Sequence, residues 1–143
     1  IGLGGSAGHN HKGHPAESAG DMYRLATTQN FCAVTGACLM VKTAVYRAIG
    51  GLDEANFAVA YNDVDFCLRL REAGLLNVMT PFAAGVHYES KSRGDDTKSG
   101  GEKQARYERE KAAFVEKYRA LMEQGEPYYN PHLTLLYENY GWR

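Results

Sequence analysis

The sequence predicts an α/β domain in which a short mixed sheet is flanked by helices. Residues 31–43, FCAVTGACLMVKT, are rich in consecutive apolar and β-branched residues, as buried strands are. Residues 63–73 and 101–125 instead repeat apolar residues with the period of a helix. Strands and helices do not alternate as regular strand–helix–strand units, so α+β remains the alternative class for these residues viewed alone.

The composition indicates one globular domain over residues 1–143. An apolar content of 44% and a charged content of 23% are ordinary for such a domain. No apolar run approaches the roughly 20 residues of a membrane span, and no signal peptide is visible. The net charge of −1 gives no reason to expect nucleic acid as a partner. The abrupt start at Ile1 indicates a fragment of a longer protein.

Residues 1–24 are rich in glycine, histidine and alanine, and we expect a flexible loop. The run GLGGSAG resembles a dinucleotide fingerprint, but it lacks the preceding strand that such a site needs. Clustered imidazoles can bind a transition metal, and His9, His11 and His14 would form such a site if their rings converged. A loop that closes over a ligand and a plain surface loop are the alternatives.

The apolar run 31–43 is expected to form a buried strand or a bent strand pair, with Gly36 at a kink or a close backbone approach. Thr43 then caps a short helix that ends at Gly50 and Gly51. The three cysteines, Cys32, Cys38 and Cys67, include no CxxC pair. We expect buried, reduced thiols in a cytosolic protein, with zinc binding or a catalytic thiol as the alternatives.

The helix over residues 63–73 is predicted to have Asn62 as its cap and Asp63 and Asp65 in its first turn. Residues two apart on a helix point about 200° apart, so these carboxylates cannot flank one glycosidic bond as a hydrolase pair does. Either both aspartates only stabilise the helix start, or one of them acts alone as a general base.

Residues 75–80 are expected to form a strand that stops before Pro81, and residues 83–89 a second one. Residues 90–101 are polar and glycine-rich, which predicts a flexible loop. The helix over 101–125 precedes an extended tail, residues 125–143, that wraps over the domain. His87 follows the second strand, and Lys91 and Arg93 follow it in the loop. That grouping fits a metal-bound diphosphate, although a lone histidine is more often structural.

Three segments together resemble the C-terminal half of a family-2 glycosyltransferase with the GT-A fold, of the rhamnosyltransferase-like kind. They are TGACLMVKT followed by GGLDE, then NDVDFCLRLREAG, then TPFAAGVHYESKSRG with its histidine about twenty residues on. The resemblance covers roughly residues 25–95. It implies the acceptor-side half of that fold, whose nucleotide-binding half is outside this chain.

The resemblance also implies roles for individual residues. Asp63 matches the catalytic base, which removes the proton of an acceptor hydroxyl while a sugar leaves a nucleotide diphosphate with inversion. Acceptor contacts are expected from Gly36, Ala37, Asp53 and Asn62, although Asn62 replaces the family's usual glutamate. His87 matches the position of a metal ligand, and Lys91 and Arg93 match positions that bind the nucleotide diphosphate. Asp63-Val64-Asp65 spells DxD, but it opens a helix and is not the metal motif of the fold.

The resemblance therefore implies a glycosyltransferase of bacterial surface polysaccharide synthesis, with a nucleotide-diphosphate sugar as donor and a glycan or lipid-linked acceptor. It implies a divalent cation, Mn²⁺ or Mg²⁺, bound only together with the missing half. We expect the fragment alone to be inactive, the location to be cytoplasmic or at the inner face of the membrane, and exposed apolar edges to favour a homodimer. The alternative is a non-catalytic module, derived from a glycosyltransferase, that binds a glycan or a protein.

Overall fold

The computed structural model describes residues 1–88 and 100–143. Four α-helices and two strands form its framework: β1 (Gln29–Phe31), α1 (Thr43–Ala48), α2 (Asn62–Glu72), β2 (Asn77–Met79), α3 (Gly101–Lys117) and α4 (Arg119–Gln124). Three short 3₁₀ turns, η1 (Leu3–Gly5), η2 (Asp21–Tyr23) and η3 (Gly36–Cys38), lie between them. None of the described helices is long and apolar enough to cross a membrane.

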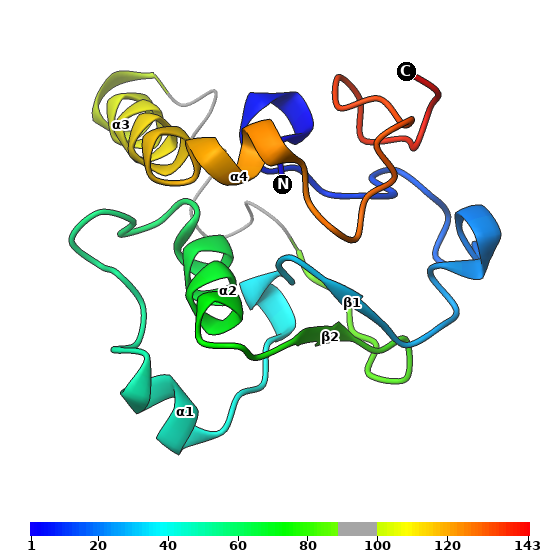
Figure 1. Ribbon diagram of the computed structural model, residues 1–143, viewed down its shortest axis with the longest axis horizontal. Coiled ribbons are helices and arrows are strands. Elements are labelled where there is room, and N and C mark those ends of the chain that lie inside the picture. Colours follow the sequence, from blue (N-terminus) through cyan, green and yellow to red (C-terminus); the bar gives the residue numbers. More distant parts are fainter. Residues whose placement is uncertain (89–99) are drawn as a thin grey trace.

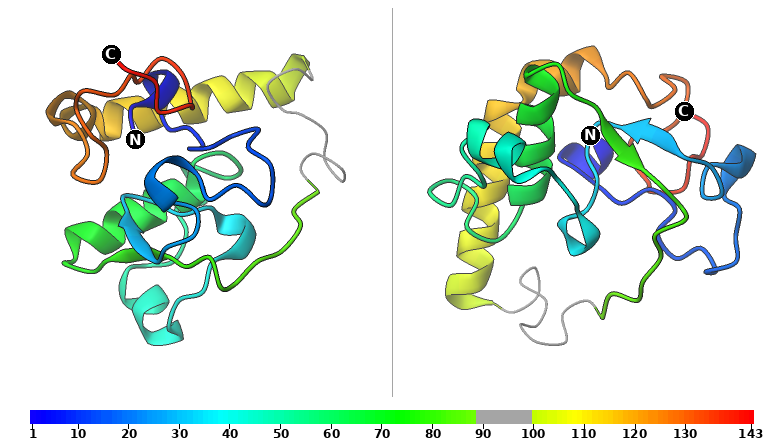
Figure 2. Two further views of the ribbon diagram at one scale, coloured as in Figure 1. Left: turned by 90° about the vertical axis from the view of Figure 1, so that its right-hand side faces the viewer. Right: turned by 90° about the horizontal axis from the view of Figure 1, so that it is seen from below.

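Helix α2 lies between the β1–β2 pair and the long α3–α4 segment (Figures 1 and 2). The two strands are antiparallel, with Asn30 opposite Val78. Within the described residues the sheet is therefore antiparallel and two-stranded, and the expectation of a mixed sheet was wrong there. The buried side chain of Asn77 donates hydrogen bonds to the carbonyls of Cys32 (2.8 Å) and Cys67 (2.9 Å), which joins the sheet to α2.

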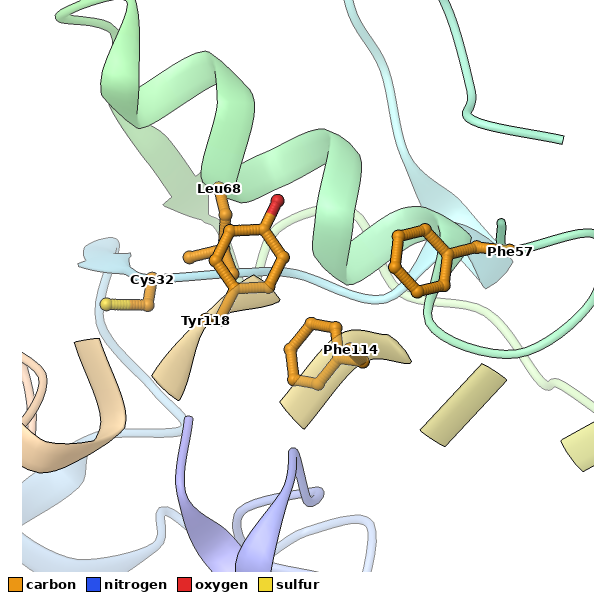
Figure 3. Packing of buried hydrophobic residues seen from close by; sticks show 5 residues of the cluster. All are labelled: Cys32, Phe57, Leu68, Phe114 and Tyr118. Carbon is orange, nitrogen blue, oxygen red and sulfur yellow. The ribbon is translucent and has the colours of Figure 1, made fainter. Parts of the chain in front are cut away.

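The main core lies between α2 and the α3–α4 segment. Five buried side chains contact one another there (Figure 3): Cys32, Phe57, Leu68, Phe114 and Tyr118. A second cluster joins the beginning of the chain to its end, because Leu3 packs with Tyr129 and Tyr140. Residues 1–24 thus contribute buried side chains, including Leu3, Ser6 and His11.

The predicted strand over residues 31–43 was wrong for all but Phe31. Residues 36–38 instead form the turn η3, in which the Thr35 hydroxyl oxygen accepts a hydrogen bond from the Ala37 N–H at 3.3 Å. A threonine that satisfies a backbone donor in this way favours a turn over a strand. The same turn leaves Cys38 exposed, so the expectation of three buried thiols was wrong for this one.

Other boundaries differ in detail. Thr43 is the first residue of α1 rather than its cap, and no side chain caps that helix. The predicted strand over 83–89 is not formed over residues 83–88, and residue 89 lies outside the described residues. The long C-terminal helix is interrupted at Tyr118, whose φ of −110° separates α3 from α4.

Candidate active site at the start of helix α2

The Asp63 carboxylate lies in the first turn of α2 and is held by two backbone N–H groups. Its Oδ1 accepts a hydrogen bond from the N–H of Val64 at 2.8 Å, within the helix. Its Oδ2 accepts one from the N–H of Gly36 at 2.7 Å, across from η3. The side chain is half-buried. Asp63 is thus fixed between a helix start, which favours negative charge, and a turn distant in sequence.

Gly36 approaches Asp63 so closely that a side chain would not fit easily. A Cβ atom on Gly36 would lie 3.0 Å from the Cβ of Asp63 and 3.3 Å from its Oδ2. The predicted close backbone approach is therefore confirmed. Gly36 and Ala37 are both exposed, so this backbone borders the carboxylate on the surface of the molecule.

Helix α2 starts with a strained tyrosine instead of a capping asparagine. Tyr61 has a φ of 62°, in the left-handed region, and no side chain caps the helix. Asn62 is the first helical residue, so its predicted capping role was wrong. A left-handed conformation costs about 1–2 kcal/mol for a residue other than glycine.

The contacts of Tyr61 explain why this strain is tolerated. Its ring stacks on Phe114 with centroids 4.7 Å apart, and its hydroxyl lies 3.1 Å from the Ser6 Oγ and 3.3 Å from the Tyr107 hydroxyl. Burial raises the pKa of Tyr61, so its hydroxyl stays protonated. The strained backbone therefore anchors the start of α2, and with it Asp63, to α3.

Asp65 points away from Asp63, and the groups that surround it give it a structural role. Its side chain is fully buried, and it accepts hydrogen bonds from Lys117 Nζ (2.6 Å), Arg69 Nε (2.7 Å) and the Tyr118 hydroxyl (2.7 Å). Burial alone would raise its pKa, but the hydrogen bonds from Lys117, Tyr118 and Arg69 outweigh that effect and hold the pKa below its ordinary value. Asp65 therefore does more than stabilise the helix start, because it joins α2 to the α3–α4 junction.

Arg69 extends this network to the turn that follows α1. While its Nε binds Asp65, its two terminal nitrogens donate to the carbonyls of Ile49 (2.8 Å) and Gly51 (2.7 Å). These three bonds hold Arg69 against the turn. The same ion pair that anchors α2 thereby positions the segment that carries Asp53.

Asp53 lies at the end of that turn with both carboxylate oxygens engaged. The Asn56 side chain donates to both of them, and the Asn56 N–H to Oδ1, which together lower the pKa of Asp53. Lys117 Nζ is 3.9 Å from its Oδ2. Asp53 and Asp65 therefore share one lysine, while Asp63 is held separately by Gly36.

Among the described residues, no contact brings His87, the residue expected to bind the metal, to Asp63. His87 is exposed and follows Phe82 in an irregular segment, and Lys91 and Arg93 lie outside the described residues. In residues 1–88 and 100–143, no three His, Cys, Asp or Glu side chains gather to hold a metal. The candidate triad of His9, His11 and His14 is included in that finding.

His11 itself is buried, although no pattern in the sequence predicts this. Its ring packs against Tyr140 at 4.6 Å and against His14 at 5.0 Å, and its Nδ1 is 3.8 Å from Asp21 Oδ2. Burial, with a smaller contribution from His14, lowers the pKa of His11. It therefore belongs to the packing of residues 1–24 against the tail.

Sequence reasoning missed Lys117 and Tyr118 as partners of Asp65. Their positions lie more than fifty residues further along the chain, and only the helical repeat of apolar residues over 101–125 indicated a buried face there. The Asp65–Arg69 pair, four residues apart on one helix, was the local signal for an ion pair.

The chain is similar to several known bacterial proteins. It is 46% identical over 136 residues to the uncharacterised protein y4gI of Sinorhizobium fredii. That match covers 94% of this chain and 14% of the relative. It is 40% identical over 117 residues to the O-antigen biosynthesis protein RfbC of Myxococcus xanthus, covering 81% of this chain and 8% of the relative.

A shorter match links the chain to a named transferase. It is 38% identical over 66 residues to the N-acetylglucosaminyl-diphospho-decaprenol L-rhamnosyltransferase of Mycobacterium tuberculosis, covering 46% of this chain and 21% of the relative. The chain thus spans between 8% and 21% of the length of these relatives. No protein-family model matches it, and no solved structure matches it.

Proposed function

We propose that this chain is the acceptor-side, catalytic part of an inverting glycosyltransferase with the GT-A fold, of the family-2, rhamnosyltransferase-like kind, acting in bacterial surface polysaccharide synthesis. The similarity to RfbC and to the rhamnosyltransferase supports the class of reaction. The observation that carries the proposal is the position of Asp63: a half-buried carboxylate at a helix start, held by the N–H groups of Gly36 and Val64.

Asp63 acts in this proposal as the general base. An ionised carboxylate has about four lone-pair positions, and the two backbone N–H groups use two of them. The others can accept the acceptor hydroxyl. As the hydroxyl oxygen bonds to the anomeric carbon of the donor, its proton passes to Asp63 and the bond from that carbon to the diphosphate breaks. Displacement in line inverts the anomeric centre.

The acceptor is proposed to contact the groups around Asp63. Gly36 and Ala37 are exposed beside it, and Asn62 precedes it in the same helical turn. Asp53 is kept in place by Asn56 and Lys117, and its carboxylate retains lone pairs for sugar hydroxyls. The donor is proposed to be a nucleotide-diphosphate sugar and the acceptor a glycan or a lipid-linked glycan, at a cytoplasmic site or the inner membrane face.

A divalent cation, Mn²⁺ or Mg²⁺, is the cofactor that the GT-A fold implies. The described residues do not fit a metal site by themselves, because His87 is a single exposed imidazole without converging ligands. His87, with Lys91 and Arg93 for the diphosphate, remains a proposal that requires ligands from outside this chain.

The test is Asp63→Asn in the full-length protein. Asparagine keeps the shape of the side chain but cannot take a proton, so transfer from nucleotide-diphosphate sugars should fall by about 10²–10⁴-fold. Glu123→Gln, an exposed change on α4, is the matched control and should leave transfer unchanged. Turnover retained in the Asp63→Asn protein, with its melting temperature unchanged, removes Asp63 as the base. The 143-residue chain alone should show no transfer.

A non-catalytic glycan- or protein-binding module is the second candidate. It is favoured by Asn62, which stands where the resembled family usually has glutamate. In that case the full-length protein should bind a glycan or protein without transferring any sugar, and Asp63→Asn should not weaken this binding.

A further inference from the structure

The tail, residues 125–143, contains a hollow that the proposed reaction does not use. Its volume is about 610 Å³, and it lies between residues 134–137 and residues 139–143. This volume falls within the range of about 300–1,000 Å³ that small-ligand sites occupy. The tail lies on the side of the molecule where η1 and the two termini are found (Figure 1).

The backbone around this tail hollow is held by hydrogen bonds. The Thr134 N–H donates to the Gly141 carbonyl at 2.7 Å, and the Arg143 N–H donates to the His132 carbonyl at 3.0 Å. Leu133 and Trp142 form an antiparallel bridge between them. The chain thus folds back on itself, and the two segments that line the hollow have a defined spacing.

Two buried tyrosines anchor this loop to the rest of the molecule. Tyr140 stacks on Tyr129 with centroids 5.3 Å apart, and both pack on Leu3. The Tyr129 hydroxyl donates to the Thr134 carbonyl at 2.7 Å. These two anchoring tyrosines are buried, whereas two other aromatic side chains of the tail are exposed to solvent.

Those side chains are Tyr137 and Trp142, which line the hollow and are 65% and 82% exposed. Large aromatic rings exposed at a concave surface are characteristic of binding sites. A pyranose ring has a face of C–H groups that packs flat on an aromatic ring, while its hydroxyls project from the edge. Tyrosine and tryptophan also carry a polar tip that can bond to those hydroxyls.

The polar lining matches the edge of such a ring. Asn139 Oδ1 accepts from the Gly141 N–H at 3.0 Å, which fixes the amide and leaves its NH₂ group to donate. Arg143 makes one long bond, 3.5 Å, to the Pro131 carbonyl and has further N–H donors. It is the one charged side chain among the described residues that line this hollow, and its free N–H groups can donate to the hydroxyls of a sugar.

We propose that the tail hollow is a binding site for an oligosaccharide, whose sugar faces stack on Tyr137 and Trp142 and whose hydroxyls accept from Asn139 and Arg143. A lipid or an apolar peptide would leave these donors unused. The site needs neither Asp63 nor a sugar donor, so it goes beyond the proposed transfer reaction and stands apart from it.

The chain itself supplies the probe for a test, because Trp142 is its single tryptophan. The 143-residue protein is titrated with chitotriose, maltotriose and cellotriose, and Trp142 fluorescence is recorded. At least one of the three should give a saturable spectral change, with a Kd in the range of about 1 mM. Mannitol at the same concentration should give none, because it has hydroxyls but no ring face.

Four variants then assign the site. Tyr137→Ala and Asn139→Ala should each weaken binding by about fivefold or more, whereas Phe82→Ala, an exposed aromatic outside the tail, should bind like the wild type. Asp63→Asn should also bind normally, so loss of transfer and loss of binding are distinguished. Circular dichroism checks that the variants fold.

Three results would overturn the proposal. One is the absence of a saturable change with all three sugars at about 10 mM, roughly ten times the expected Kd. Another is an equal response to mannitol. The third is unweakened binding by folded Tyr137→Ala and Asn139→Ala proteins, which would place the sugar elsewhere.

Discussion

Gly36 and Asp63 show how one backbone contact can position a reactive carboxylate. The N–H of Gly36 is 2.7 Å from Asp63 Oδ2, and there is almost no room on Gly36 for a methyl group. The glycine is needed here for the space beside the carboxylate, since its own φ is not in the left-handed region. Adding one methyl group to Gly36 is therefore a specific way to displace the Asp63 carboxylate.

We therefore expect Gly36→Ala in the full-length protein to lower kcat/KM of sugar transfer by about tenfold or more, because a displaced base costs at least ~1.4 kcal/mol of transition-state stabilisation. Steady-state kinetics with a saturating donor measure this. Gly85→Ala is the control, because a methyl group at Gly85 meets no atom within 4 Å. Equal kinetics for the wild type and Gly36→Ala would mean that this contact does not position the base.

Besides the packing of Tyr61 and Leu68, a buried carboxylate joins helix α2 to the α3–α4 segment. Asp65 binds Lys117 and Tyr118 from that segment, and Arg69 from its own helix. Removing one member of a buried ionic network leaves the other charges uncompensated. At the scale of elements, the packing of these helices therefore depends on the charge of Asp65.

Asp65→Asn should lower the free energy of unfolding by about 3 kcal/mol at pH 7. Because the folded protein lowers the pKa of Asp65, its charge-dependent stabilisation is fully present above the unfolded pKa of about 3.9 and is lost as pH falls through the folded pKa. Urea unfolding should show a constant difference between wild type and variant from pH 7 to about 5, which narrows in stronger acid. Glu123→Gln should show no such difference; a gap that widens in acid contradicts this account.

The sequence predicted some elements well because their signals are local. Helix α2 and strand β2 follow from periodicity and from the flanking Gly74 and Pro81, and the structure confirms both. The strand predicted over 31–43 failed because Thr35 satisfies a backbone donor locally and turns the chain at Gly36. A run of apolar residues contains no information about that hydrogen bond.

The candidate site was predictable only in part, for a similar reason. The pattern of Asp63 and Asp65 at a helix start was visible, and the close approach of Gly36 was expected. What distinguishes the two aspartates is their partners, Gly36 for one and Lys117 and Tyr118 for the other. Those partners lie 27 to 53 residues away, where local patterns do not reach.

Many large apolar side chains of the described residues are exposed on the surface of the molecule. Several lie within or next to β2 and in the segment after it, including Leu76 and Val78, and Phe82 and Val86, which are 88% and 79% exposed. Among the described residues β2 pairs with β1 alone, so its other edge has no strand partner. Such surfaces and edges favour association.

We expect the 143-residue chain to form homodimers at high concentration through this region. Phe82→Asp should raise the dimer dissociation constant by about tenfold or more, a change of ~1.4 kcal/mol, because the interface would bury an unpaired charge. Sedimentation velocity over a concentration series measures it. Met22→Ser, which removes an equally exposed side chain from η2, should leave the constant unchanged. A monomer at all concentrations would contradict the expectation.

The stacking of Tyr61 on Phe114 also has a consequence for the order in which the protein becomes competent during synthesis. The strained Tyr61 at the start of α2 is supported by the ring of Phe114, which lies 53 residues further along the chain. Lys117, which binds Asp65, follows shortly after Phe114 in the sequence. A nascent chain that ends before α3 already contains Gly36, Asp53 and Asp63 but lacks the groups that fix them in place. Translation past Lys117, rather than past the last proposed site residue, is therefore the step at which the site can acquire its geometry.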